Sequence, residues 1–132
     1  MARTRFIEHK GHKIVFMDFA RIESIEAGVQ YAKEAQEFVA AQPKKKHLLT
    51  LVDVSDSPFN RQITDALSKL SSHNKPYVIA NATVGVTGLK GTLLKTISRL
   101  TGRNLKAFDD VDEAKDWLVE EGKKFAESGD ED

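Results

Sequence analysis

Residues 48–54, Leu-Leu-Thr-Leu-Val-Asp-Val, constrain the fold of this chain more than any other segment. A short, nearly continuous apolar run is typical of a strand covered on both faces, as the strands of parallel sheets are. A polar turn at residues 55–60 follows at once and leads into a helical pattern. Because ligands of open α/β sheets bind beyond the carboxyl ends of the strands, this turn marks the edge where a functional site is expected.

The composition is that of one globular domain. The chain has 132 residues, 40% hydrophobic and 30% charged, and a chain of this size buries about two thirds of its surface around a single core. Its 20 Lys and Arg residues match its 20 Asp and Glu residues, so no net charge attracts nucleic acid. The absence of cysteine excludes disulfides, thiolate zinc sites and a cysteine nucleophile. With neither a signal-peptide pattern nor a run of about 20 apolar residues for a transmembrane segment, we expect a cytoplasmic protein.

Hydrophobic periodicity and turn residues predict the order β-β-α-β-α-β-α-β-α. Lys10-Gly11-His12 predicts a hairpin turn between strands at 6–8 and 14–19. The other expected elements are helix 22–39, strand 48–54, a helix from 57 to about 74, strand 77–80, helix 89–100 closed by Gly102, strand 104–108 and a helix from 111. Right-handed crossovers would then give a mixed, mostly parallel sheet with helices on both faces. We expect one domain over residues 1–126 and an acidic flexible tail over 127–132.

Ser57 followed by Pro58 is expected to begin the second helix, as its N-cap and first helical residue. The dipole and free amides at a helix N-terminus favour added negative charge. Ser57, with Ser55 beside it, is therefore the candidate phosphoacceptor. An ordinary cap is the alternative interpretation, since serine is preferred there whatever the function.

Five segments spread over nearly the whole chain carry recognisable motifs: RFIEHKG at 5–11, LVDVS at 51–55, HNKPYV at 73–78, VGVTGLK at 84–90, and AF at 107–108 running into EAKDWL at 113–118. Together with the element order, they resemble the STAS-like superfamily, and within it the bacterial SpoIIAA-like group of small domains. The resemblance implies a single-domain mixed sheet with an N-terminal β-hairpin. The group has no well-assigned activity.

The resemblance also implies two kinds of function. In superfamily members that antagonise anti-sigma factors, a strand ends in Asp-hydrophobe-Ser, and a later Asp-Ser-Ser-Gly turn carries a regulatory phosphoserine. Asp53-Val54-Ser55 is similar to the first motif, whereas only the pair Asp56-Ser57 is present from the second. The wider clan is also similar to domains that carry small molecules and lipids.

A second turn, GVTGLKG at 85–91, has glycines three apart at a strand-to-helix junction. Its free amides and Lys90 would suit a phosphate or carboxylate, and a tight turn with close helix packing is the alternative interpretation. Parallel connectivity predicts that this turn and residues 55–60 face each other across a crevice. The candidate ligand-binding or partner-binding residues at this edge are Asp53, Asp56, Phe59, Asn60, Gly85, Thr87, Gly88 and Lys90.

Other charged residues carry weaker signals. Lys95, Arg99 and Arg103, four apart, predict a basic row with Lys90 and Lys106, either as a solvated helix face or as a contact for an anion, an acidic partner or a membrane surface. No two of the four histidines are spaced as helical metal ligands, so no metal site is expected.

No catalytic motif is present, so we expect no catalytic residue, no cofactor and no enzymatic activity. Strand-end carboxylates at Asp18, Asp53 and Asp56 that together hold a cation would be the basis of an enzymatic alternative.

The sequence therefore favours a non-enzymatic regulatory or binding module that contacts a protein partner through the strand-end edge. The alternative is a binding or carrier domain for a small apolar or amphipathic anion. In that case Phe59, Leu89, Leu93 and Leu94 would line a pocket, and Lys90 would pair with the head group. Pairing through a sheet edge or a helix face would give a homodimer.

Overall fold

A computed structural model describes residues 2–103 and 105–128, without the side chains of Leu89, Lys90, Leu93, Leu100 and Thr101. Within these residues, five strands form one sheet in the order β1-β2-β3-β4-β5. The strands are β1 (Thr4–His9), β2 (His12–Asp18), β3 (Leu48–Asp53), β4 (Val78–Val84) and β5 (Leu105–Phe108). β1 runs antiparallel to β2, and the remaining neighbours are parallel.

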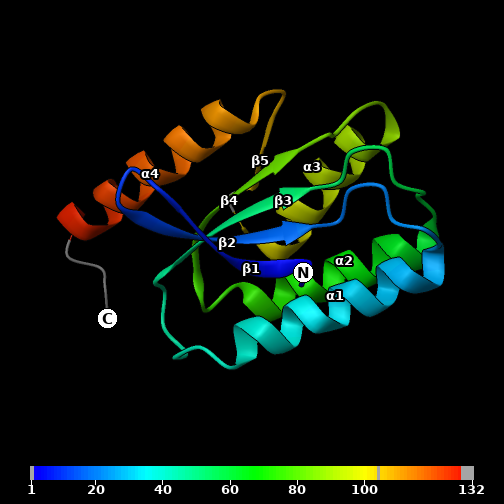
Figure 1. Cartoon of the computed structure of the whole chain (residues 1–132), viewed down its shortest axis with the longest axis horizontal. Helices are drawn as coiled ribbons and strands as arrows, with labels where there is room; N and C mark the ends of the chain where they lie inside the picture. Colours follow the sequence, from blue (N-terminus) through cyan, green and yellow to red (C-terminus); the bar gives the residue numbers. More distant parts are fainter. Residues whose placement is uncertain (1, 104, 129–132) are drawn as a thin grey trace.

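The sheet is covered on both faces (Figure 1). The helices are α1 (Ile25–Ala40), α2 (Arg61–Asn74), α3 (Leu89–Thr101) and α4 (Val111–Ser128). Because β2 to β5 lie in chain order and right-handed crossovers join them, α1, α2 and α3 all fall on one face, and α4 packs on the other. The expected fold class is confirmed.

Two hydrophobic cores share the sheet. Val15, Met17 and Leu48 belong to the core beneath α1 and α2, whereas Leu51 and Leu118 belong to the core beneath α4. β3 contributes to both cores and is the middle strand of the five, as its apolar sequence predicts.

The expected start of α2 is wrong. The helix begins at Arg61, and Asn60 is its N-cap, since Asn60 Oδ1 accepts a hydrogen bond from the Ile63 amide at 3.0 Å. Ser57 and Pro58 precede the helix as an irregular segment. The physical reason is that the Ser57 hydroxyl bonds to a loop distant in sequence, so it is not available to cap a helix.

Two other elements run further than expected. β4 continues to Val84 because its buried polar residues bond inside the sheet: Thr50 donates to Asn81 Oδ1, and Asn81 Nδ2 donates to Thr83 Oγ1 at 3.0 Å. α4 continues to Ser128, so the first two residues of the expected tail are helical, and residues 129–132 lie outside the described part. Gly102 closes α3 in the left-handed conformation, as expected.

Candidate functional site

The turns after β3 and β4 lie side by side at the carboxyl edge of the sheet. The Val54 amide donates to the Val84 carbonyl at 3.0 Å. Gly85 has a φ of +83° and lies so close to Ser55 that a Cβ there would collide with the Ser55 backbone and hydroxyl. The structure therefore brings the two predicted turns into direct contact at this point.

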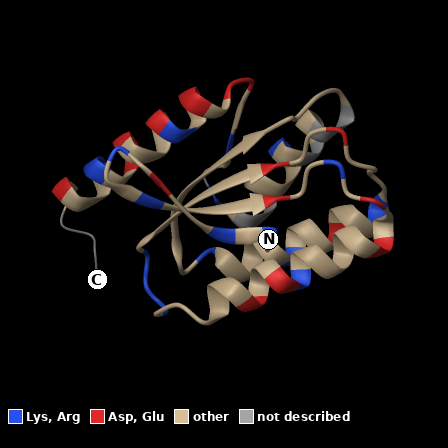
Figure 2. Ribbon diagram, in the orientation of Figure 1, with Lys and Arg blue, Asp and Glu red and all other residues tan. Residues whose placement is uncertain are grey.

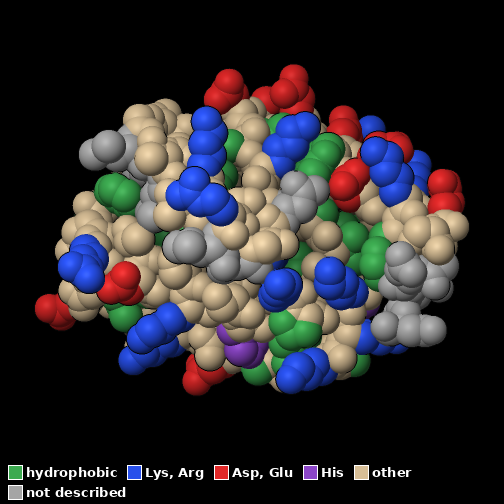
Figure 3. Space-filling model, turned by 180° about the vertical axis from the view of Figure 1, so that it is seen from behind, with side chains coloured by type: hydrophobic (Ala, Val, Ile, Leu, Met, Phe, Trp, Pro, Cys, Tyr) green, Lys and Arg blue, Asp and Glu red, His purple; other side chains and the backbone are tan. Residues whose placement is uncertain are grey.

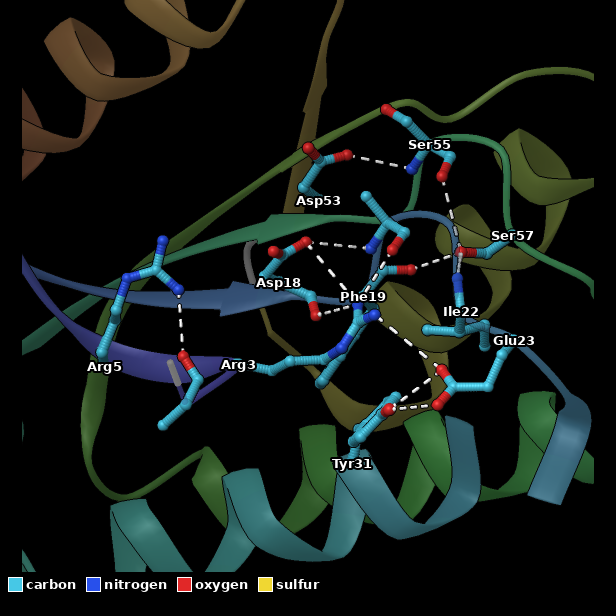
Figure 4. A network of polar contacts seen from close by, with 12 residues as sticks. Arg3, Arg5, Asp18, Phe19, Ile22, Glu23, Tyr31, Asp53, Ser55 and Ser57 are labelled. Atoms are coloured by element: carbon cyan, nitrogen blue, oxygen red, sulfur yellow. Dashed lines mark hydrogen bonds and ion pairs between the residues drawn. The ribbon is translucent and has the colours of Figure 1, made fainter. Parts of the chain in front are cut away.

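Both candidate phosphoacceptor residues, Ser55 and Ser57, lie within this packing (Figure 4). Ser57 Oγ donates to the Phe19 carbonyl and accepts from the Ile22 amide at 3.1 Å. The half-buried Ser55 side chain lies against Gly85. The Ser57 hydroxyl therefore joins the segment before α2 to the loop after β2, which is a structural role.

The other predicted site residues divide into inward and outward positions. Phe59 is half-buried and lines a cavity, and the Asn60 side chain caps α2. Asp56, Thr87 and Gly88 are exposed, with positive φ at Asp56 and Gly88. The Lys90 side chain lies outside the described residues, as do those of Leu89 and Leu93.

Acidic residues end two neighbouring strands (Figure 2). Asp18 and Asp53 are register partners of β2 and β3. Each bonds a backbone amide two residues ahead, at 3.1 Å for Asp18 and 2.9 Å for Asp53. Over residues 2–103 and 105–128, no three His, Asp or Glu side chains gather as a metal site requires. Each of the two carboxylates accepts a hydrogen bond within the turn that follows its own strand.

A brace from the N-terminus holds the loop after β2 (Figure 4). Arg3 Nη1 donates to the carbonyls of Asp18 at 3.1 Å and Ala20 at 2.8 Å, and the guanidinium stacks 4.5 Å from the Tyr31 ring centre. The Tyr31 hydroxyl donates to Glu23. A hydrogen bond from the Glu23 backbone amide, followed by the one from Tyr31, lowers the pKa of Glu23. The hydrogen bond with Glu23 raises the pKa of Tyr31. This brace fixes the loop to which Ser57 is bonded.

A cavity of about 110 Å³ lies beneath the two turns, between the sheet and helices α2 and α3. It extends from Pro58 and Phe59 at the carboxyl edge of the sheet to Arg103 and Leu105 at the opposite edge. Its walls are mainly apolar and include Met17, Val52, Leu67, Leu70, Leu94 and Ile97. Such a space suits an apolar group of a few carbon atoms, because a comparable engineered cavity of about 150 Å³ binds benzene.

The polar residues of the cavity include a charged group, Arg103. Its Nη1 donates to both the carbonyl and the hydroxyl of Ser71, each at 3.2 Å. No carboxylate in the described residues pairs with this guanidinium. Burial lowers the pKa of Arg103 to about 10, because removal from water disfavours the charged form.

One solved structure with a similar fold is the crystal structure of an uncharacterized protein from the DUF3478 family with a SpoIIAA-like fold, from Shewanella loihica. It matches with a TM-score of 0.65 and 15% sequence identity, over 87% of this chain and 91% of that chain. This chain has a SpoIIAA-like fold. At this identity the match shows the fold alone. No protein-family model matches the sequence, and no curated protein matches it.

The SpoIIAA-like fold explains which candidate residues come together. Connectivity predicted the neighbouring turns, and of the residues expected to line a pocket, Phe59 and Leu94 do so. The described residues of this SpoIIAA-like domain include no helix long and apolar enough to cross a membrane.

Sequence reasoning missed the role of Arg103 in the SpoIIAA-like fold. It counted Arg103 in a basic row because the residue follows Arg99 by four positions. Gly102, however, reverses the backbone at the end of α3, so Arg103 leaves the helical face and contacts α2. An arginine directly after a glycine C-cap was the available signal.

Proposed function

We propose that this protein is a non-enzymatic binding domain that encloses a small apolar or amphipathic molecule between its sheet and helices α2 and α3. The observation that carries the proposal is the cavity of about 110 Å³ with mainly apolar walls. Pockets for small molecules are concave, mostly apolar and supplied with a few polar groups, as this one is.

The surroundings of the candidate serines support this function over a phosphorylation switch. A switch needs a hydroxyl that a kinase can reach, but Ser57 Oγ holds two backbone groups of the neighbouring loop. Regulation of a protein partner through Ser57 or Ser55 stays a prediction. The exposed Asp56 and Thr87 at the same edge are where such a partner would make contact.

Neutral probes test the binding function. Hexan-1-ol and xenon should bind saturably and shift the amide resonances of residues that line the cavity. Leu67→Phe should weaken hexan-1-ol binding about tenfold or more, because the larger ring occupies part of the space. Val111→Phe is the matched control, since Val111 is 38% exposed on α4 and remote from the cavity. Absence of saturable binding, or equal binding by the Leu67→Phe variant, would overturn the proposal.

A further inference from the structure

Arg103 is placed at one end of the cavity by backbone as well as side-chain contacts. Ser98 Oγ donates to the Arg103 carbonyl at 2.6 Å, which ties the residue to the end of α3. The two contacts from Nη1 to Ser71 tie the guanidinium to α2. The side chain thus bridges the two helices that cover the cavity and has little freedom to move away.

The guanidinium keeps donors to spare. An arginine carries five N–H groups, and both contacts in the described residues come from Nη1. Among the described residues, Thr4 Oγ1 is the one side-chain polar atom that is fully enclosed and has no partner. The Nε and Nη2 atoms of Arg103 also have no partner there, so they are not fully enclosed. Both groups are therefore open to the cavity or to solvent. Together these two groups form the planar fork that holds a carboxylate through two hydrogen bonds.

Asn74 gives a second polar group at the same end. It is 2% exposed, lines the cavity, and its Oδ1 is 2.8 Å from His73 Nδ1. Its amide nitrogen has no acceptor among the described residues. A half-buried arginine and a buried amide beside an apolar space make a site that is polar at one end and apolar along its length.

Charge on the surrounding surface favours an anion at this end. Figure 3, which views the molecule from behind, shows Lys and Arg side chains spread over the face, with Asp and Glu mostly toward its rim. Lys95 and Arg99 are exposed on α3, and Lys75 Nζ is close to Gly102, next to Arg103. A local positive field of this kind raises the concentration of anions near the surface.

We propose that Arg103 binds the carboxylate of a short amphipathic acid whose apolar part occupies the cavity. The inference rests on the proposed function, because it assumes that the cavity holds a ligand. A single guanidinium balances a single negative charge, which favours a carboxylate. A bound carboxylate would also compensate the burial that now disfavours the charged form of Arg103.

A comparison of hexanoate with hexan-1-ol and methyl hexanoate on the unmodified protein tests the inference. Affinities measured by calorimetry, with amide shifts that locate the site, should favour hexanoate about tenfold over the two neutral probes. Arg103→Met should remove this preference, so that hexanoate and the two neutral probes bind this variant with similar affinities. Arg103→Lys should retain part of the preference. Arg99→Met, which removes the same charge from an exposed position on α3, should leave the preference intact.

The outcomes separate the two proposals. Equal affinities for hexanoate and the neutral probes would overturn the role of Arg103 and leave the binding function standing. No binding of any probe would overturn both. If Arg103→Met does not fold, the comparison of the three probes on the unmodified protein still decides the inference.

Discussion

Ser57 illustrates how a single hydroxyl can have a different partner from the one its local sequence suggests. Serine before proline is a preferred helix start, and that preference alone predicts a cap. In the structure, Asn60 takes the cap position, and Ser57 bonds to Phe19 and Ile22, more than thirty residues away. Capping preferences describe the nearest amides, so they carry no information about a loop that folding brings alongside.

Ser57→Ala is expected to destabilise the fold by about 1–3 kcal/mol, because it leaves the Phe19 carbonyl and the Ile22 amide without their shared partner. Urea denaturation followed by circular dichroism measures the change. Ser72→Ala, at an exposed position of α2, is the control and should stay within about 0.5 kcal/mol of the parent. Ser57→Asp should be more damaging still, and a fully stable Ser57→Asp variant would revive the phosphorylation hypothesis.

At the scale of elements, the positions of helices and strands could be predicted well. Apolar periodicity identified α1, α2 and α3, and the continuous apolar run identified β3. The end of β4 was placed too early because polar residues are buried there. Asparagine is depleted in strands, yet Asn81 is buried in β4, where hydrogen bonds with Thr50 and Thr83 satisfy its side chain. The position of the candidate site at the carboxyl edge of the sheet could be predicted from connectivity. The cavity and the place of Arg103 in it could not, because both depend on packing between elements distant in the sequence.

The turn after β4 depends on a glycine that the turn after β3 touches. Gly85→Ala should cost at least about 2 kcal/mol, because its φ of +83° is unfavourable for alanine and a Cβ would collide with the Ser55 backbone. Gly91→Ala is the matched control. A Cβ there meets Val86 at an ordinary 3.7 Å, so the change should stabilise α3 by about 0.5–1 kcal/mol. Equal effects in thermal denaturation would show that contact with Ser55 is not what requires Gly85.

On the scale of the whole molecule, a charged cluster joins the first hairpin to the last helix. Asp116 of α4 lies 2.7 Å from His9 Nε2 and 2.9 Å from Lys10 Nζ. The contact with His9, followed by that with Lys10, lowers the pKa of Asp116, and Asp116 in turn raises the pKa of Lys10. The contact between His9 and Asp116 connects residues 107 positions apart in the sequence.

The stabilising effect of Asp116 should depend on pH in a defined direction. A lowered pKa means that the folded state favours the ionised carboxyl, so its contribution is present above the ordinary value of 3.8 and is lost as the pH falls through the folded value. Asp116→Asn should therefore lower the urea midpoint at neutral pH, and this difference from the parent should shrink below 3.8. Asp65→Asn, at an exposed carboxylate of α2 with no ion pair in the described residues, is the control. A difference that does not change with pH would contradict the assignment.

The strands lie in the sheet in the same order as in the chain, and this order has a consequence for synthesis. As the nascent chain leaves the ribosome, each new strand can join the edge of the strands already formed, and no strand has to insert between two others. Helix α4 is the exception, since it covers the opposite face and is made last. Until it emerges, Leu49, Leu51 and Ala82 have no helix to cover them, and the unfinished protein exposes an apolar sheet face that invites association with other chains.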